Sequence, residues 1–234
     1  FTSDRQERTE RYELISECLE AVDLPQLVPF RYWPEGVRID GKLYPMVTMS
    51  WVTGVTLYEW ARKTSQSGAS DEFLKLDDRW IELVRSLGDL QIAHGDLQHS
   101  NVLVTAENEL KLVDYDGMCV PALAGRRNLE IGVRPYQHRE RDESTLLSPK
   151  LDNYSALVIY VALRALASSP ALWDVHVTRD DNENLLFCSE DFTQHRDSAL
   201  FRSLVALPDA QTRRMSEKLF AYSAGALAAV PSLD

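Results

Sequence analysis

The sequence predicts an α+β fold in which a small β-sheet precedes a larger, mostly helical region. Between Lys75 and Ala93, apolar residues recur every three or four positions, which is typical of one face of an amphipathic helix. Two pairs of short apolar segments, each pair separated by turn-forming residues, indicate β-hairpins. The segment 151–163 is apolar nearly all round, which predicts a buried helix at the centre of the helical region.

The first hairpin is predicted by residues 36–39 and 42–46, which flank Asp40-Gly41. Asp-Gly is favoured in two-residue hairpin turns because both central positions need a positive φ. Before this hairpin, the charged segment 4–20 contains an apolar stripe of Leu14, Ile15, Cys18 and Leu19 and is expected to be helical. We expect a linker-like loop at 63–70 and helices between 200 and 230.

The second hairpin is predicted by the apolar segments on either side of Ala106-Glu107-Asn108. Because a hairpin brings its two ends together, Asp114 is expected to lie beside Asn101. Asp96 precedes Asn101 by five residues, in a loop that leaves the helix ending near Ala93. Carboxylate and amide oxygens are the hard ligands that Mg²⁺ prefers, and a carboxylate in a loop can accept the proton of a hydroxyl group.

The segments His94-Gly95-Asp96-Leu97-Gln98-His99-Ser100-Asn101 and Val113-Asp114-Tyr115-Asp116-Gly117 resemble the catalytic and metal-binding motifs of the protein-kinase-like superfamily. The resemblance implies a protein-kinase-like fold with ATP and Mg²⁺ as cofactors. It implies that Asp96 is the catalytic base and that Asn101 and Asp114 bind the metal. Asp116 stands where the motif expects Gly, so it is the alternative metal ligand.

The same resemblance divides the chain into a single domain with two parts. Residues 1–52 would form part of an N-lobe and the hinge, and residues 53–234 would form a mostly helical C-lobe. Carried over by position, Met49 is the gatekeeper, the backbones of Ser50 and Val52 face the adenine edge, and Leu103 lies beneath the ring. An ordinary edge strand followed by a Gly turn is the structural alternative for residues 47–57.

Two acidic positions outside the motifs receive roles from the resemblance. Glu17, in the first helix, is the candidate partner of a phosphate-binding lysine, with Glu13 and Glu20 as alternatives and a solvent-exposed face as the structural explanation. Asp152 begins the buried helix, where a carboxylate can cap the free N–H groups. The resemblance adds that Asp152 holds the backbone of the catalytic loop. Tyr136-Gln137-His138 is expected to pack beneath a loop rather than to bind substrate.

The sequence also departs from the protein-kinase pattern. Gly95 and Gln98 stand where many kinases carry Arg and Lys, and the His-Gly-Asp variant is shared with aminoglycoside and choline phosphotransferases. No Gly-rich loop and no strand lysine precede the first helix. We therefore expect the chain to be a fragment of a longer protein, inactive by itself and inclined to associate through its exposed sheet.

The function that these patterns favour is an ATP- and Mg²⁺-dependent phosphotransferase acting on serine or threonine of a protein substrate. A non-catalytic pseudokinase and a small-molecule kinase of the aminoglycoside type are the alternatives.

Composition limits the partners. The net charge of −11 argues against a nucleic-acid-binding surface, because phosphate backbones are held by an excess of Lys and Arg. No apolar run is long enough to predict a membrane span, and no signal peptide is evident. The three cysteines have no metal-ligand spacing, which favours a reduced, cytoplasmic setting. The sequence leaves the oligomeric state open.

Overall fold

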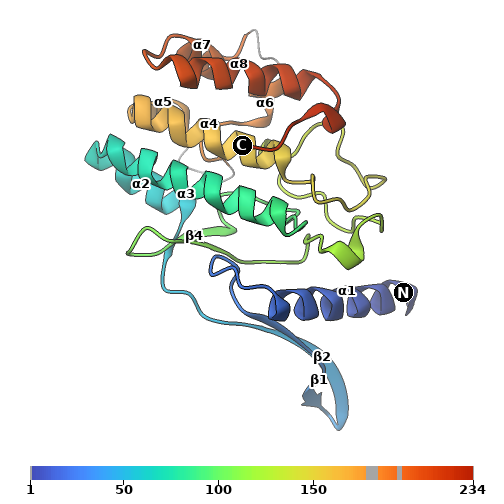
Figure 1. Cartoon of the computed structure of the whole chain (residues 1–234). Coiled ribbons are helices and arrows are strands. Elements are labelled where there is room, and N and C mark those ends of the chain that lie inside the picture. The colour runs from blue at the N-terminus through green and yellow to red at the C-terminus, as the bar shows by residue number, and fades with distance from the viewer. Residues whose placement is uncertain (1, 178–183, 194–196, 234) are drawn as a thin grey trace.

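The computed structural model describes residues 2–177, 184–193 and 197–233, and these form a mixed α+β fold. Figure 1 shows helical layers stacked above a small β region, with the first helix and a long hairpin at the opposite end. The α+β prediction is confirmed. The strands belong to two small antiparallel sheets, one of two strands and one of three.

The chain begins with helix α1 (Thr2–Ala21), followed by strands β1 (Phe30–Ile39) and β2 (Lys42–Met49). These strands form the predicted hairpin, and its turn residues Asp40 and Gly41 have φ values of 48° and 79°. Two consecutive positive φ angles are what a two-residue turn needs to match the twist of its strands. The register shifts between Trp33 and Val37, so the hairpin bends there.

The second sheet contains β3 (Val55–Thr56), β4 (Val102–Val104) and β5 (Leu110–Leu112), in that order. The β4–β5 pair is the predicted second hairpin, with shorter strands than the sequence suggested. This sheet connects to the first part of the chain because Leu27 bridges to Leu112 in β5. The β4–β5 hairpin therefore starts and ends close to the segment that joins α1 to β1.

The helical region contains α2 (Leu57–Ser67), α3 (Ser70–Asp89), α4 (Asn153–Ser168) and α8 (Ala210–Ala224) as its main helices. The shorter helical segments are η1 (Pro121–Leu123), η2 (Arg134–Tyr136), α5 (Leu172–His176), α6 (Ser189–Thr193), α7 (Ala199–Val205) and η3 (Leu227–Ala229). Helix α4 lies between α3 and α8, and its side chains are buried on nearly all sides, as predicted. The indole N–H of Trp80 in α3 donates to the carbonyl of Ala156 in α4 over 3.0 Å, which fixes the register of the two helices.

The expected linker-like loop at 63–70 is wrong. Residues up to Ser67 continue α2, Gly68 ends it, and Ser70 already begins α3. Two side chains of this segment donate to helix carbonyls instead of forming a loop: Thr64 donates to Trp60 O and Ser67 donates to Thr64 O. The α3 helix consequently begins five residues earlier than the apolar spacing suggested and ends at Asp89, before the predicted end at Ala93.

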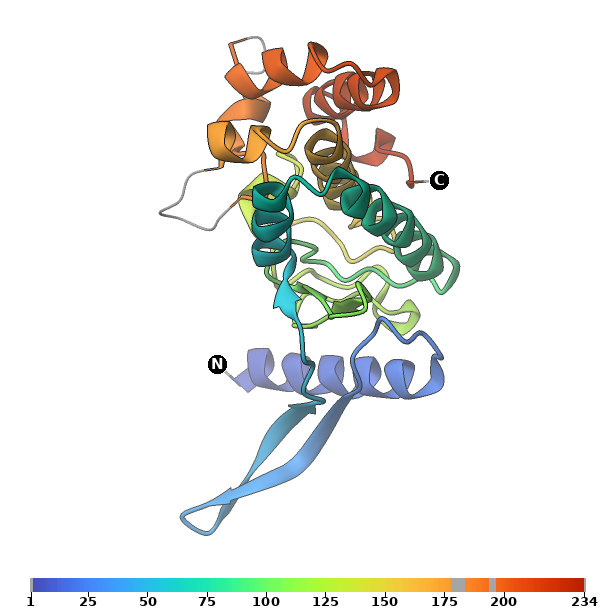
Figure 2. The same cartoon turned by 90° about the vertical axis from the view of Figure 1, so that its left-hand side faces the viewer.

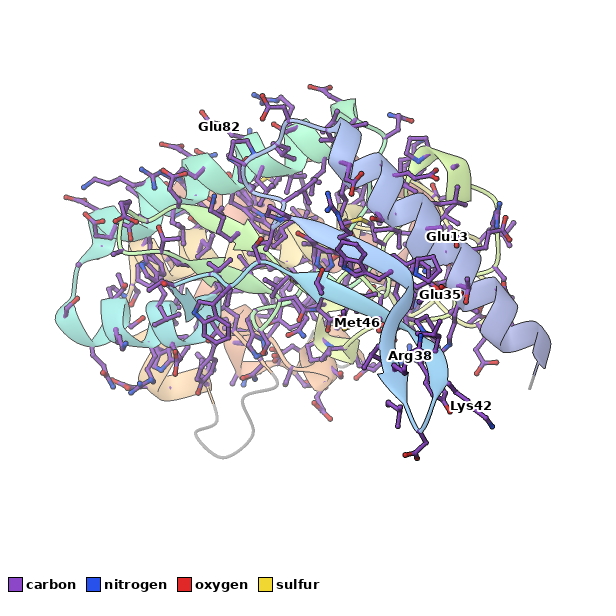
Figure 3. The ribbon with its side chains drawn as sticks, turned by 90° about the horizontal axis from the view of Figure 1, so that it is seen from below. Glu13, Glu35, Arg38, Lys42, Met46 and Glu82 are labelled. Atoms are coloured by element: carbon purple, nitrogen blue, oxygen red, sulfur yellow. The ribbon has the colours of Figure 1, made fainter. Side chains whose placement is uncertain are left out.

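The β1–β2 hairpin extends away from the helical body (Figure 2), and its side chains are largely exposed. Figure 3 shows Glu35, Arg38, Lys42 and Met46 on this projecting part. Apolar side chains are also exposed there, including Trp33 at 41% and Ile39 at 53%. A two-stranded sheet with apolar, unpaired surfaces is marginally stable by itself, so the hairpin depends on its anchorage to α1.

Among the described helices, none combines the length and the apolar composition needed to cross a lipid bilayer.

A buried carboxylate lies between the helices α3, α4 and α8. Asp77 is 1% exposed, and its Oδ2 lies 3.7 Å from a guanidinium nitrogen of Arg164, while its Oδ1 has no hydrogen-bond partner among the described residues. Burial raises the pKa of Asp77 to about 7. Arg164 also pairs with Asp209, which caps α8 through the N–H of Thr212.

Replacing Asp77 with Asn should change how stability depends on pH. The folded protein holds a proton on Asp77 up to about pH 7, whereas the unfolded chain releases it near the ordinary value of about 4. The stability of the wild type should therefore fall between these values as pH rises, and Asp77→Asn should remove this part of the loss. The measurement is urea unfolding of both proteins from pH 4.5 to 8. The exposed neighbour Asp78→Asn is the control, and an equal pH dependence in all three proteins would contradict the assignment.

Candidate active site

Residues 94–101 form a loop that lies against the segment 114–118. After α3 ends, Ala93 and Cys119 exchange two backbone hydrogen bonds of 2.9 and 2.8 Å, which places the two segments side by side. Gly95 has a φ of 81°, and a Cβ atom at this position would collide with the carbonyl oxygen of Gly117. The close approach of the two loops thus requires glycine at residue 95.

Asp152 fixes the start of this loop through two hydrogen bonds. Its two carboxylate oxygens accept the backbone N–H groups of His94, at 2.5 Å, and of Gly95, at 2.9 Å. The side chain makes no hydrogen bond to the first turn of α4, so the expected capping role is wrong. Both carboxylate oxygens are directed at the loop N–H groups instead of at the helix N–H groups. The second predicted role, holding the loop backbone, is the one that the hydrogen bonds support.

Arg141 holds the same loop from the other side. It is 1% exposed, and its guanidinium donates to the carbonyl oxygens of Gly95, at 2.6 Å, and of Glu130, at 3.1 Å. A further hydrogen bond runs to Oε1 of Gln137. Asp152 also lies close enough to stabilise the positive charge of Arg141 electrostatically. Arg141 therefore ties the loop 94–101 to the long segment that follows Asp114.

His94 connects the loop to the hairpin. Its Nε2 lies 2.9 Å from the carbonyl oxygen of Val113, and its Nδ1 accepts the N–H of Asp96 at 3.3 Å. A carbonyl can only accept and an N–H can only donate, so this environment selects the neutral tautomer with the proton on Nε2. The imidazole ring also contacts Tyr115 edge to face, and Tyr115 contacts Phe30 at the base of β1 in the same way.

Asp96 and Asn101 are in direct contact. The side-chain amide of Asn101 donates to Oδ2 and to the backbone oxygen of Asp96, both at 3.0 Å. Because both bonds use Nδ2, the amide oxygen of Asn101 is directed away from Asp96. The remaining Asp96 oxygen, Oδ1, accepts the backbone N–H of Val133 at 3.2 Å. Asp96 is half-buried, and Asn101 is buried.

Asp114 and Asp116 have different surroundings. Asp116 Oδ1 accepts the hydroxyl of Tyr12 at 3.0 Å, and its backbone oxygen accepts a guanidinium N–H of the buried Arg11 at 3.0 Å. Asp116 is thus tied to α1. Asp114, with a φ of 69°, is exposed and makes no ion pair with the residues that the structure describes. Of the two candidates, Asp114 is the one whose carboxylate is left for a ligand.

The electrostatics around Asp114 favour a cation. Although the residue is exposed overall, surrounding atoms partly desolvate the Asp114 carboxylate, and this desolvation, with Asp116 and Asp96 nearby, raises its pKa. Burial and the same three carboxylates also raise the pKa of Glu130. Closely spaced carboxylates resist simultaneous ionisation, and a bound cation would relieve that repulsion.

The donor set fits Mg²⁺ bound together with a phosphate. Asn101 and Asp114 offer one amide oxygen and one carboxylate, and Mg²⁺ usually takes only one or two ligands from protein. Across the described ranges, no group of three His, Cys, Asp or Glu side chains is arranged to hold a metal alone. These residues would therefore hold Mg²⁺ only when a ligand such as a nucleotide supplies further oxygens.

The residues predicted to surround adenine do not all line the same groove. Met49 and Ser50 line a groove of about 540 Å³ together with the end of α1 and the start of β1, and neither Val52 nor Leu103 lines that groove. The N–H of Ser50 donates to Pro29 O at 3.0 Å, which leaves its carbonyl oxygen available. The backbone of Val52 makes no hydrogen bond with a described residue, and Leu103 is half-buried in β4.

The candidate glutamates of α1 lie on its exposed face. Glu17 is exposed and makes no ion pair with any described residue, and Glu13 is exposed as well (Figure 3). Glu20 pairs with Arg31 at 2.9 Å on the surface. Glu17 therefore lies on a solvent-exposed face of α1, as the structural explanation expected, and has no ion-pair partner among the described residues.

Tyr136 and His138 pack as expected. The hydroxyl of Tyr136 lies 2.7 Å from Nδ1 of His99 and accepts the N–H of Leu185 at 2.8 Å, and burial raises the pKa of Tyr136. His138 lies 3.1 Å from the carbonyl oxygen of Tyr222. Gln137, between them, has a different environment and faces the neighbourhood of Asp96.

Sequence reasoning missed Arg141 and the approach of Val133 to Asp96. Arg141 carries no local signal, because an arginine in a polar loop is ordinarily exposed. The glycine at 132, with a φ of 81°, was the detectable signal: a side chain there would collide with Asp96 Oδ1 and would lie 2.7 Å from Gln137 Nε2.

No protein-family model matches the sequence, and no curated protein resembles it closely enough in sequence to count as a relative.

Replacing Asp152 with Ala should destabilise the protein. The substitution leaves two buried backbone N–H groups without an acceptor, and each such group costs about 1–3 kcal/mol. We expect the free energy of unfolding, measured with urea, to fall by about 2–6 kcal/mol on that basis. The exposed Asp89→Ala, at the end of α3, is the matched control and should change it by less than about 0.5 kcal/mol. Equal effects of the two substitutions would show that Asp152 does not hold the loop.

Proposed function

We propose that this chain is the catalytic-loop part of a protein-kinase-like phosphotransferase that uses ATP and Mg²⁺ and acts on hydroxyl groups of a protein substrate. The single observation that carries the proposal is the placement of Asp96, Asn101 and Asp114. They come from two segments of the chain that backbone hydrogen bonds hold side by side, and Asp152 anchors the first of these segments. The resemblance of both motifs to the kinase-like superfamily agrees with this placement.

Asp96 is proposed as the general base. It is half-buried in a loop held at both ends, and its carboxylate is oriented by Asn101. An oriented carboxylate can accept the proton of a substrate hydroxyl as the oxygen attacks phosphorus. Before a hydroxyl reaches Oδ1, it must replace the N–H of Val133 as the hydrogen-bond partner or share the oxygen with it.

Asn101 and Asp114 are proposed as the metal ligands. When bound, Mg²⁺ neutralises part of the charge on the nucleotide phosphates. The chain contributes one carboxylate and one amide oxygen at a fixed separation from Asp96. Asp116 has a structural role instead, because Tyr12 and Arg11 connect it to α1.

A non-catalytic nucleotide-binding module is the second candidate. Glu17 has no lysine partner among the described residues, and the sequence contains no Gly-rich loop. In this chemistry, a lysine and a backbone cradle stabilise the phosphate charge that develops during transfer. Nucleotide binding without turnover by the chain alone is therefore consistent with both candidates.

The two aspartates should differ in metal binding. We expect Asp114→Ala to weaken Mn²⁺ binding in the presence of ATP by about tenfold or more, because the substitution removes a metal ligand. Changing a residue that only supports a ligand already costs about 10–100-fold in metal affinity. Asp116→Ala should change the affinity much less. The measurement is water-proton relaxation enhancement by Mn²⁺, with the thermal stability of both variants checked in parallel. The reverse ranking would make Asp116 the ligand.

Asp96→Asn should separate binding from turnover. The amide keeps the size of the side chain but cannot accept a proton, so nucleotide affinity should persist while transfer falls by about 10²–10⁴-fold. This measurement needs a protein that also supplies a Gly-rich loop and a lysine opposite Glu17.

For the 234-residue chain alone, we expect no radiolabelled phosphate transfer above its Asp96→Ala background. Undiminished turnover in Asp96→Asn would refute the assignment of the base.

A further inference from the structure

A pocket lies beside the segment 134–139, and one of its lining residues, Gln137, connects it to the surroundings of Asp96. Val133 contacts Asp96 through its N–H, and η2 (Arg134–Tyr136) follows immediately. The pocket has a volume of about 390 Å³, and its walls come from η2 and the residues after it, from α4, from α6 and from the end of α8. Figure 1 shows α4, α6 and α8 as neighbours at this end of the helical region.

Gln137 links this pocket to Asp96. Its side chain lines the pocket, and its Nε2 lies beside Gly132, next to Asp96 Oδ1. Gln137 is only 5% exposed, and its Oε1 is held by Arg141. Nε2 has no hydrogen-bond partner among the described residues. A buried amide nitrogen without an acceptor is costly, so a ligand that offered an acceptor to Nε2 would remove that cost.

The charged side chains that line the pocket are positive. Arg134 and Arg139 line it, and no described Asp or Glu does, in a chain whose net charge is −11. Arg134 is exposed, and its side chain makes no hydrogen bond or ion pair with the described residues. Arg139 donates to the carbonyl oxygen of Ala224 at 2.6 Å, which directs its guanidinium along the pocket wall.

The rest of the lining is apolar or already engaged. The rings of Tyr154 and Phe192 lie 5.8 Å apart, centroid to centroid, and form an apolar wall. The hydroxyl of Thr193 donates within α6, and that of Ser223 donates to Phe220 O. The pocket thus combines free donors at one end with a surface that can pack against methylene groups.

We propose that this pocket binds an acidic side chain of the acceptor peptide, with Arg134 and the Nε2 of Gln137 as the groups that recognise its carboxylate. The inference rests on the proposed function, since it assigns the substrate class of the same site. Arg134 directly follows Val133, so the carboxylate belongs to a residue within about two positions of the phosphorylated hydroxyl, given a reach of roughly 3.3–3.6 Å per extended residue.

Peptide binding to the 234-residue chain tests the proposal without requiring turnover. Two fluorescein-labelled peptides have a central serine in an alanine background and carry either Glu or Gln two residues away on both sides. Fluorescence anisotropy should show the Glu peptide bound more tightly by at least about threefold, which is the range of a partly exposed ion pair. The preference should decrease as salt is raised.

Two variants and one control assign the preference to this pocket. Arg134→Gln removes the free cation, and Gln137→Glu keeps an oxygen for Arg141 while it replaces the donor with a carboxylate, so both should abolish the preference for Glu. Arg127→Gln, an exposed arginine of the same segment outside the pocket, should retain it. A wild type that does not distinguish the peptides, or a preference that survives Arg134→Gln, overturns the proposal.

Two further results test the identity of the ligand and distinguish the pocket proposal from the proposed phosphotransferase function. If N-acetylglutamate amide competes at the concentration at which the peptide binds, the ligand is a small carboxylate and the peptide assignment is wrong. A preference for Glu in a chain that fails to bind Mg²⁺ with ATP supports the pocket and contradicts the proposed function. Binding of Mg²⁺ with ATP, without a preference for Glu, supports the proposed function and contradicts the pocket proposal.

Discussion

The hydrogen bonds from the His94 and Gly95 N–H groups to Asp152 are the interaction on which the candidate site depends. A short loop has little structure of its own, because its backbone groups must find partners outside it. Here one buried carboxylate at the start of the central helix α4 supplies two acceptors at once. The most buried helix of the protein thereby determines where Asp96 lies.

A positively charged side chain, that of Arg141, is the second group that holds the loop 94–101. Arg141 donates to the carbonyl of Gly95, so the same residue is held at its N–H by Asp152 and at its oxygen by Arg141. A buried carboxylate and a buried guanidinium are each costly when alone, and their proximity offsets part of that cost. Because Arg141 also binds Glu130 and Gln137, it makes the position of the segment 130–137 depend on the position of the loop 94–101.

The local features of this fold could be predicted from sequence. The Asp40-Gly41 turn, the apolar spacing of α3 and the composition of α4 act over a few residues, and the structure confirms each element. The pairing of Asn101 with Val113, the residue before Asp114, was also predictable, because a hairpin between them leaves few alternatives. The boundaries of α2 and α3 were not, since Ser and Thr at 64–67 satisfy helix carbonyls as well as they form turns.

Local sequence patterns do not predict contacts between distant segments. The residues near Asp152 predict only a helix cap, and the resemblance alone indicated that its carboxylate holds a loop 57–58 residues away. The contact of Val133 with Asp96 joins residues 37 positions apart. Such contacts depend on how α3, α4 and the long segment after Asp114 pack, and hydrophobic periodicity carries no information about that packing.

The central claim is that Asp96, Asn101 and Asp114 form one site for a nucleotide-bound metal. The most direct test is paramagnetic broadening in the ¹⁵N NMR spectrum of the wild-type chain when Mn²⁺ is added in the presence of ATP. The account predicts that the side-chain amide signals of Asn101 broaden first, while those of Asn128 and Asn153 persist at the same Mn²⁺ concentration. Broadening of another amide before that of Asn101, or no ATP-dependent broadening, would contradict it.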